Sequence, residues 1–256
     1  NRIVQNKGWS ASTFNNVTLR SYDSPDEFFT NPYGLSMAEI TASSLLKVNS
    51  SGHVVEQGTT FCTFNKTGLK LNAKIHKARP DVNCILQLHT NLLVSLATLK
   101  CGFLPISQQA IMCGDVGYHD YEGFEASDDD DEICARIVKD LGEKSKLLIL
   151  NNSSVLVCAR TVEEVWFLVN MFMNACEIQL TSLAAVGGNE DELIKPSDEV
   201  IEKARTKIEA YYRDGKVQKT DSYSVVWRVG EVEFELEMRQ LDYTYHNTGY
   251  KYKTFS

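Results

Sequence analysis

The segment from Leu71 to His89 (LNAKIHKARPDVNCILQLH) constrains the fold most, because it sets a helix directly before a buried strand. Helical spacing of apolar residues extends over residues 69–78 and ends before the following proline, which cannot continue a helix. Residues 82–88 form a short apolar run, which predicts a strand buried on both faces. Alternate side chains of a strand share a face, so we expect Gln87 and His89 to point the same way.

Helical and strand-like runs alternate through the middle of the chain, and no internal repeat is present. This order predicts an α/β sandwich in one domain, residues 1–188, with residues 189–256 appended to it. The helix expected over residues 161–185 begins with the capping-box pattern Thr161-x-x-Glu164. It is so apolar that we expect another element or subunit to cover it.

Shorter elements are predicted by the same signals. Apolar runs flanked by turn residues predict strands, and capped runs with helical spacing predict helices. The predicted strands are residues 45–48, 53–55, 110–113 together with Val116, 147–150 and 155–157, and the predicted helices are residues 91–100, 133–141, 199–212 and 229–242.

The composition excludes several classes of protein. The net charge is −8, and nucleic-acid binding needs clustered Lys and Arg, so no nucleic-acid partner is expected. No run of eighteen apolar residues is present, so no membrane span is expected. The seven cysteines form no CxxC pair and mostly lie in apolar contexts, which predicts reduced core cysteines in a cytosolic protein. The chain begins without Met, and we expect it to be an excised domain.

The acidic run Ser127-Asp128-Asp129-Asp130-Asp131-Glu132 has two interpretations. Acidic residues favour the N-terminus of a helix, and helical apolar spacing follows at once. A cation site is the alternative, although adjacent acids lack the spacing of an EF-hand loop.

Several motifs occur in order along the chain: GLSMAEITASSLLKVN (34–49), LKCGFLPIS (99–107), GYHDYEG (117–123), ACEIQ (175–179), FELEMRQLD (234–242) and TGYKY (248–252). Together they are similar to the adducin head, a branch of the class II aldolase family. The similarity runs from Gly8 to about Tyr252. It implies an α/β fold, a class II aldolase-like α/β/α sandwich around a mostly antiparallel central sheet.

The resemblance implies a metal centre that this chain has altered. Active members of the family are tetramers with zinc at subunit interfaces, held by three His ligands beside an acid/base Glu. Those ligand positions fall on Gln87, His89 and Ser153, so one imidazole remains. An amide oxygen and a hydroxyl are poor zinc ligands, and we expect no metal and no cofactor. His76 and His119 hold no ligand position, and each is expected to be a polar or packing residue.

The acid/base and phosphate-binding positions implied by the family are changed as well. The acid/base Glu falls near Gly68, and a His position of the following helix falls on Asn72. Asn16 and Thr67 occupy positions where the family binds phosphate. Tyr33 replaces a small hydroxyl residue there, and its ring is expected to fill the space for a phosphate.

The sequence therefore predicts a non-catalytic adducin-like head: an oligomerising scaffold of the spectrin–actin membrane skeleton, cytoplasmic and at the plasma membrane. Homo- or hetero-oligomers of adducin-like chains are the expected assembly, with spectrin and actin bound by the full-length protein. Two alternatives stay open. One is a metal-dependent aldolase, lyase or epimerase acting on a small phosphorylated substrate. The other is a pocket that binds an anion or metabolite without turnover.

Overall fold

A computed structural model describes the chain except residues 12, 124–130, 220–223, 245 and 254–256. The chain divides into two compact units. Unit 1 comprises residues 1–102 and 115–161, and unit 2 comprises residues 103–114 and 162–256. The long apolar helix thus clusters with unit 2, whereas the boundary expected from the sequence lay at residue 188. That domain boundary stays a prediction.

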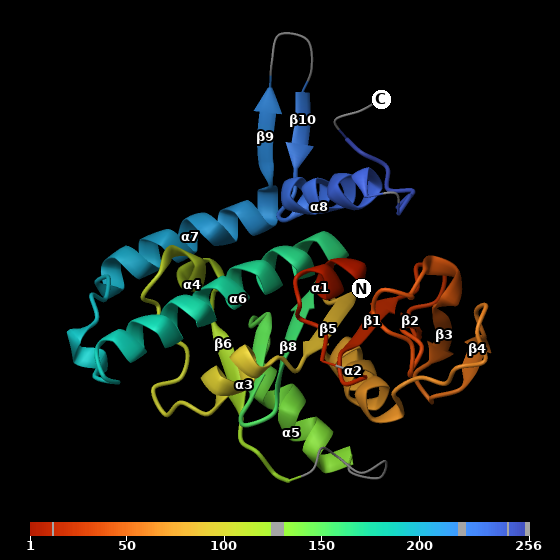
Figure 1. Ribbon diagram of the computed structural model, residues 1–256, viewed down its shortest axis with the longest axis horizontal. Coiled ribbons are helices and arrows are strands. Elements are labelled where there is room, and N and C mark those ends of the chain that lie inside the picture. The colour runs from red at the N-terminus through yellow and green to blue at the C-terminus, as the bar shows by residue number, and fades with distance from the viewer. Residues whose placement is uncertain (12, 124–130, 220–223, 245, 254–256) are drawn as a thin grey trace. The chain divides into compact units, whose positions relative to one another are not determined.

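Unit 1 is built on an eight-stranded sheet in the order β4-β3-β2-β1-β5-β8-β7-β6 (Figure 1). Only the β6–β7 pair is parallel, so the sheet is mostly antiparallel, as predicted. The strands are β1 (Asn16–Arg20), β2 (Glu27–Thr30), β3 (Leu46–Asn49), β4 (Val54–Glu56), β5 (Cys84–Leu88), β6 (Val116–His119), β7 (Leu147–Leu150) and β8 (Ser154–Ala159).

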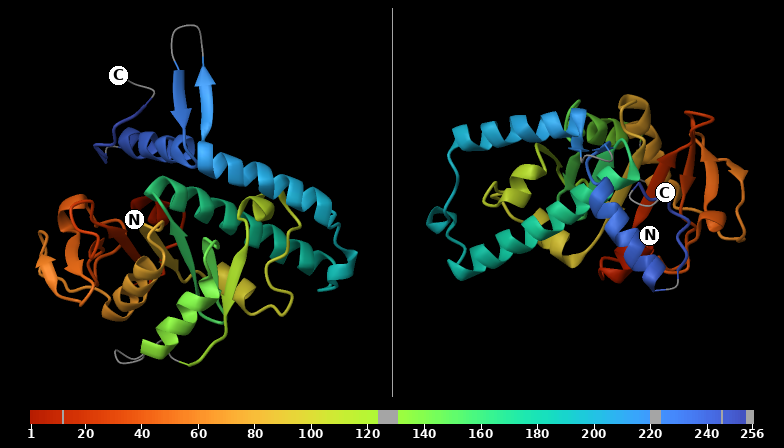
Figure 2. Two further views of the ribbon diagram at one scale, coloured as in Figure 1. Left: turned by 180° about the vertical axis from the view of Figure 1, so that it is seen from behind. Right: turned by 90° about the horizontal axis from the view of Figure 1, so that it is seen from above.

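Two helices, α2 (Lys66–Ala78) and α5 (Asp131–Leu141), lie side by side on the sheet of unit 1 (Figure 2). Asn65 caps α2 by accepting a hydrogen bond from the backbone N–H of Gly68, and Arg79 ends the helix just before the proline. Their apolar faces share one core with β5, β7 and β8, strands in which every residue is buried. Unit 1 also contains α1 (Arg2–Asn6), η1 (Ala42–Ser44) and α3 (Asn91–Ala97).

Unit 2 is organised around α6 (Val162–Ala185). Both α4 (Gln108–Met112) and α8 (Glu231–Tyr243) pack against α6, which confirms that other elements cover this apolar helix. The side-chain oxygen of Gln179, buried within α6, accepts a hydrogen bond from the backbone N–H of Leu104 at 2.7 Å. The remaining elements of unit 2 are η2 (Glu190–Glu192), α7 (Asp198–Asp214), β9 (Lys216–Lys219) and β10 (Ser224–Trp227).

The strand predicted at Ala110–Cys113 is wrong, because these residues belong to α4 and its C-cap, whereas Val116, the other strand-like residue of that prediction, begins β6. The side chain of Ser107 caps this short helix by accepting a hydrogen bond from the N–H of Ala110 at 3.1 Å. A run of four apolar residues fits a buried helical turn as well as a strand. The other predicted strands and helices of the sequence are confirmed, although α3 ends at Ala97 rather than Lys100.

The acidic run lies partly outside the described residues, since residues 127–130 are not described. Its last two members, Asp131 and Glu132, form the first turn of α5. Asp131 bridges to Lys70 and Lys74 of α2 at 3.2 and 2.7 Å. For these residues the structure agrees with the interpretation as a charged helix start. No described helix has both the length and the hydropathy needed to cross a lipid bilayer.

Candidate functional site

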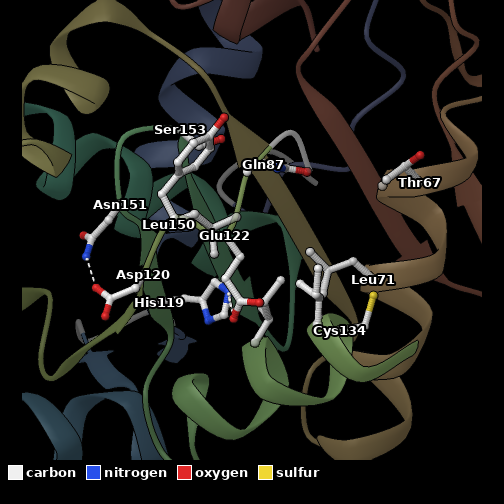
Figure 3. Close-up of a pocket in the computed structure, with 15 residues that line it drawn as sticks. Thr67, Leu71, Gln87, His119, Asp120, Glu122, Cys134, Leu150, Asn151 and Ser153 are labelled. Atoms are coloured by element: carbon white, nitrogen blue, oxygen red, sulfur yellow. Dashed lines mark hydrogen bonds and ion pairs between the residues drawn. The ribbon is translucent and has the colours of Figure 1, made fainter. Parts of the chain in front are cut away.

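The positions singled out in the sequence gather around two neighbouring hollows in unit 1. The inner pocket has a volume of about 50 Å³. It is lined by Thr67, Gly68, Leu71, Gln87, His119, Asp120, Tyr121, Glu122, Gly123, Ile133, Cys134, Ile137, Leu150, Asn151 and Ser153 (Figure 3). The outer groove has a volume of about 510 Å³. It is lined by Thr13, Phe14, Tyr33, Thr63, Phe64, Asn65, Lys66, Thr67, His89, Tyr121, Asn152 and Ser153.

Gln87 occupies the buried end of β5, at the first implied ligand position. Its side chain is 2% exposed, and its amide Nε2 donates a hydrogen bond to the Ser154 hydroxyl oxygen at 3.0 Å. Asn16 of β1 is its register partner across the sheet. The amide nitrogen is thus bonded to the neighbouring strand β8, and Gln87 offers the inner pocket a neutral amide rather than an imidazole.

His89 follows β5 and lines the outer groove rather than the inner pocket. Its backbone N–H donates to the Asn15 side-chain oxygen at 3.1 Å, which fixes the chain just after the strand. Its imidazole lies beside the Phe14 ring, with 5.8 Å between ring centroids. The one retained imidazole is therefore in contact with an aromatic ring that is itself 59% exposed.

Ser153 lines both hollows and sits in the tight turn between β7 and β8. The residue before it, Asn152, has φ 61°, a left-handed conformation that Asn tolerates better than most residues. The N–H of Asn151 donates to the His119 carbonyl oxygen at 2.9 Å, which anchors the turn to β6. The structure thus brings Gln87 and Ser153 to one pocket, while their role as vestigial ligand positions stays a prediction.

The face of α2 that lies against the sheet carries Gly68, Asn72 and His76 at intervals of four residues, and all three are buried. Asn72 is fully buried, and neither polar atom of its side chain has a hydrogen-bond partner among the described residues. The same holds for Nδ2 of Asn16, which lies against Gly68. Buried polar groups of this kind are normally satisfied by protein or by ordered water.

Gly68 is required by the close approach of Asn16. A Cβ at position 68 would lie 2.5 Å from Asn16 Nδ2, closer than side chains pack. The implied acid/base Glu therefore has no room here unless Asn16 moves. Tyr33 lines the outer groove together with Thr67, is 46% exposed, and has its hydroxyl 3.4 Å from that of Thr13. That its ring takes up the space for a phosphate stays a prediction.

We expect Gly68→Ala to destabilise the chain by roughly 1–2 kcal/mol, although Ala normally stabilises a helix by about 1 kcal/mol over Gly. The cause is the contact with Asn16, because the Gly68 backbone is ordinary helix. Urea unfolding of Gly68→Ala, of Asn16→Ala and of the double variant measures this coupling. Additive losses in the double variant would contradict the steric explanation.

His76 is a buried packing residue, as predicted. It stacks on Phe28 at 4.7 Å between ring centroids and is 1% exposed. Its Nδ1 lies 3.0 Å from the Val82 carbonyl oxygen, which can only accept, so Nδ1 carries the proton. Its Nε2 then accepts from the Thr18 hydroxyl at 3.1 Å. Burial lowers the pKa of His76 to about 4, with a smaller contribution from Arg20, so the ring is neutral at pH 7.

His119 is 7% exposed and lines the inner pocket. Its Nδ1 lies 2.7 Å from the Asp140 carboxylate, and its Nε2 lies 3.6 Å from that of Glu122. Arg136 of α5 forms a bidentate ion pair with Glu122, which lowers the pKa of the Glu122 carboxyl below its usual value. Sequence reasoning missed Glu122 and Asp140. The GYHDYEG motif contains Glu122, but no neighbouring residue in the sequence indicates that this carboxylate pairs with Arg136 of α5.

The donor set at the implied ligand positions does not fit zinc. It consists of an amide already bonded to Ser154, one imidazole in the outer groove, and a hydroxyl. Zinc sites in proteins use at least three N, S or carboxylate ligands. Over the described residues, no group of three or more His, Cys, Asp or Glu side chains is arranged to hold a metal ion. No chemical step through a metal is derived for this chain.

The chain is similar to adducins along nearly its whole length. Alpha-adducin of Mus musculus is 38% identical over 253 residues, which are 98% of this chain and 33% of that protein. Gamma-adducin of Homo sapiens is 37% identical over 252 residues, 98% of this chain and 35% of that protein. Beta-adducin of Rattus norvegicus is 36% identical over 253 residues. The chain thus spans about a third of the length of these relatives.

Solved structures confirm the predicted fold. An aldolase II superfamily protein from Pseudomonas syringae has a TM-score of 0.80 and 30% identity, covering 95% of this chain and 89% of that one. L-fuculose 1-phosphate aldolase from Glaciozyma antarctica has a TM-score of 0.69 and 25% identity, covering 80% and 77%. The family model described as "Class II Aldolase and Adducin N-terminal domain" matches residues 1–180. With the fold, the sheet order and these similarities in agreement, the chain belongs to the class II aldolase and adducin N-terminal domain family.

Proposed function

We propose that this chain is a non-catalytic adducin-like head that serves as an oligomerising scaffold of the spectrin–actin membrane skeleton, on the cytoplasmic side of the plasma membrane. The observation that carries the proposal is the 36–38% identity to alpha-, beta- and gamma-adducins across 98% of the chain. The donor set around Gln87 supports the loss of metal chemistry. Spectrin and actin binding would belong to the full-length protein. The present sequence spans about a third of the length of its alpha-adducin relative.

Metal analysis separates this scaffold from a metal-dependent aldolase, lyase or epimerase. We expect purified protein, equilibrated with zinc and then desalted, to retain far less than one zinc per chain, because Gln87 and Ser153 offer weak donors. His89→Ala should leave that content unchanged, and His53→Ala, in the turn before β4, is the matched control. One zinc per chain that is lost in His89→Ala and kept in His53→Ala would overturn the proposal in favour of the enzyme.

Self-association is the second expectation of the proposal. Light scattering of the chain at micromolar concentration should give the mass of a dimer or tetramer. A clean monomer at that concentration would contradict an oligomerising role for this head. Co-sedimentation of the head with spectrin and actin then tells whether partner binding resides here or in other parts of the protein.

A further inference from the structure

Unit 2 contains a groove between α4 and α7 that lies outside the candidate site, and it is here called the α4–α7 groove. The helix α4 packs against α7 as well as against α6 (Figure 1). The Tyr212 hydroxyl of α7 donates a hydrogen bond to the Met112 carbonyl oxygen of α4 at 3.5 Å. The groove has a volume of about 480 Å³. Pockets for small organic molecules measure roughly 300–1,000 Å³, so the groove is large enough for one such molecule.

The walls of the α4–α7 groove are mainly apolar, and water reaches most of them. The apolar residues that line it are Ile106, Ile111, Met112, Pro196, Ala204 and Ile208. Ile111 is 9% exposed, and the other apolar residues are half-buried. Removing apolar surface from water is favourable in proportion to the area that is covered. A ligand with an apolar body therefore gains affinity by lying along these walls.

The polar side chains of the α4–α7 groove are hydrogen-bond donors. Among the described residues that line it, the polar ones are Ser107, Gln108 and Lys207, and no carboxylate is present. The Ser107 oxygen accepts from the Ala110 N–H at 3.1 Å, so its own O–H stays available to a ligand. Gln108 is exposed and carries an amide NH₂ group. The polar end of a complementary ligand is therefore a hydrogen-bond acceptor with a negative charge.

Lys207 gives the α4–α7 groove its positive charge. Residues three or four positions apart are neighbours on the surface of a helix. Around Lys207 these positions hold Lys203, Ala204, Ala210 and Tyr211. None of these neighbours is acidic, and Glu202, the nearest acid before Lys207, already pairs with Arg205 at 3.2 Å. The Lys207 ammonium is thus not neutralised by its own helix, and it complements an anionic group of a ligand.

We propose that the α4–α7 groove binds a long-chain carboxylate, a single-chain amphiphile with an anionic head. The apolar tail lies along the walls of the groove, and the carboxylate accepts hydrogen bonds from the Lys207 ammonium. A slot of this size with apolar walls would take many apolar molecules, but the donors and the unneutralised cation select an anionic head. The groove shares no residue with the inner pocket or the outer groove, so this proposal is independent of the proposed scaffold function.

Titration of the full chain with dodecanoate, followed by NMR of its isoleucine methyl groups, tests the proposal. The dodecanoate concentration is kept below that of micelle formation. The methyl signals of Ile106, Ile111 and Ile208 should shift and saturate, whereas those of Ile3 and Ile149 in unit 1 should not move. Decanoate, which is shorter by two methylenes, should bind about fifteenfold more weakly, because each buried methylene strengthens binding about fourfold.

Lys207→Glu tests the anionic head, because it reverses the charge of an exposed side chain and should leave the fold intact. Its affinity for dodecanoate should fall about fivefold relative to the native chain. Decanol has the chain length of decanoate but no charge, and it should bind the native chain and the variant equally. Lys203→Glu is the matched control: Lys203 is also exposed, lies one turn earlier on α7 and is not part of the lining, so this variant should weaken dodecanoate binding far less.

Ala204→Trp tests the position of the apolar tail. Ala204 lines the groove from α7, and an indole ring there takes up the space of the ligand. Dodecanoate binding should weaken more than about tenfold, because several methylenes then lose their place in the groove. Urea unfolding of Ala204→Trp checks that the variant is folded. The surface variant Lys207→Glu decides the test if it is not.

Three results would overturn the proposal. The first is the lack of saturable shifts at the groove isoleucines up to the micelle concentration, and the second is an unchanged dodecanoate affinity in Lys207→Glu. The third is that the groove signals depend on the concentration of the chain but not on dodecanoate, because a second copy of the chain then occupies the groove. Light scattering of the same samples tests the scaffold function separately, since it reports self-association whether or not dodecanoate binds.

Discussion

Replacing Gly230 with Ala is expected to lower the free energy of unfolding by roughly 3–5 kcal/mol. Gly230 precedes α8 with φ 81°, a conformation that costs an L-residue about 1–2 kcal/mol. Its added Cβ would also lie 2.0 Å from the Glu163 carbonyl oxygen and 3.0 Å from Phe167 Cβ. Because the nearest atom belongs to backbone, α8 must move away from α6 to relieve the overlap. Urea unfolding, read from the midpoint at unchanged m-value, measures the loss.

Gly188→Ala is the matched control for the Gly230 variant. Gly188 has φ 83°, nearly the same conformation, but nothing lies within 4 Å of an added Cβ. It should therefore cost only about 1–2 kcal/mol, the strain without the overlap. Equal losses in the two variants would show that α8 does not pack against α6 as closely as the structure has it.

Acidification is expected to remove about 3 kcal/mol of stability through His76 alone. Burial, reinforced by Arg20, holds the pKa of His76 at about 4 in the folded chain, against 6.5 for an unperturbed His. Between these values the unfolded chain binds a proton that the folded chain does not, so stability falls as pH falls. The full contribution is present above about pH 6.5 and is lost by about pH 4. A difference of about 2.5 pKa units corresponds to about 3 kcal/mol.

His76→Gln isolates this contribution, because Gln offers an amide donor and acceptor but does not titrate. Unfolding free energies of the two proteins, measured from pH 7 to pH 4, should converge as pH falls, with the native chain losing more stability than the variant. Parallel curves would mean that His76 gains a proton as readily inside the fold as outside it.

Local signals in the sequence predicted the elements that carry the site. The proline that follows α2 predicted where the helix ends, and the apolar run of β5 predicted the strand. Both signals depend on neighbouring residues only. Ser197 likewise predicted the start of α7, where its side chain caps the helix by accepting a hydrogen bond from the Val200 N–H. The strand prediction at Ala110–Cys113 failed because a run of four apolar residues fits a buried helical turn as well as a strand. The cap at Ser107 was the local signal that favours the helix.

The composition of the candidate site followed from aligned motifs, but its geometry did not. The sequence placed Gln87, His89 and Ser153 at one former metal centre. The structure places His89 in the outer groove and turns the Gln87 amide toward Ser154. Side-chain direction in such a site depends on partners from other strands, which lie far away in the chain.

The sequence by itself determined the family, the α/β fold class and most of the strands and helices, since these follow from residue identity and spacing. Only the tertiary structure decided which side chains meet. It set Asn16 against Gly68, joined His119 to Asp140 of α5, and bonded the Lys253 backbone N–H to Glu235 of α8. These contacts join residues that are 18 to 52 positions apart in the chain, and they exist because burial and charge select one packing among many that the local sequence allows.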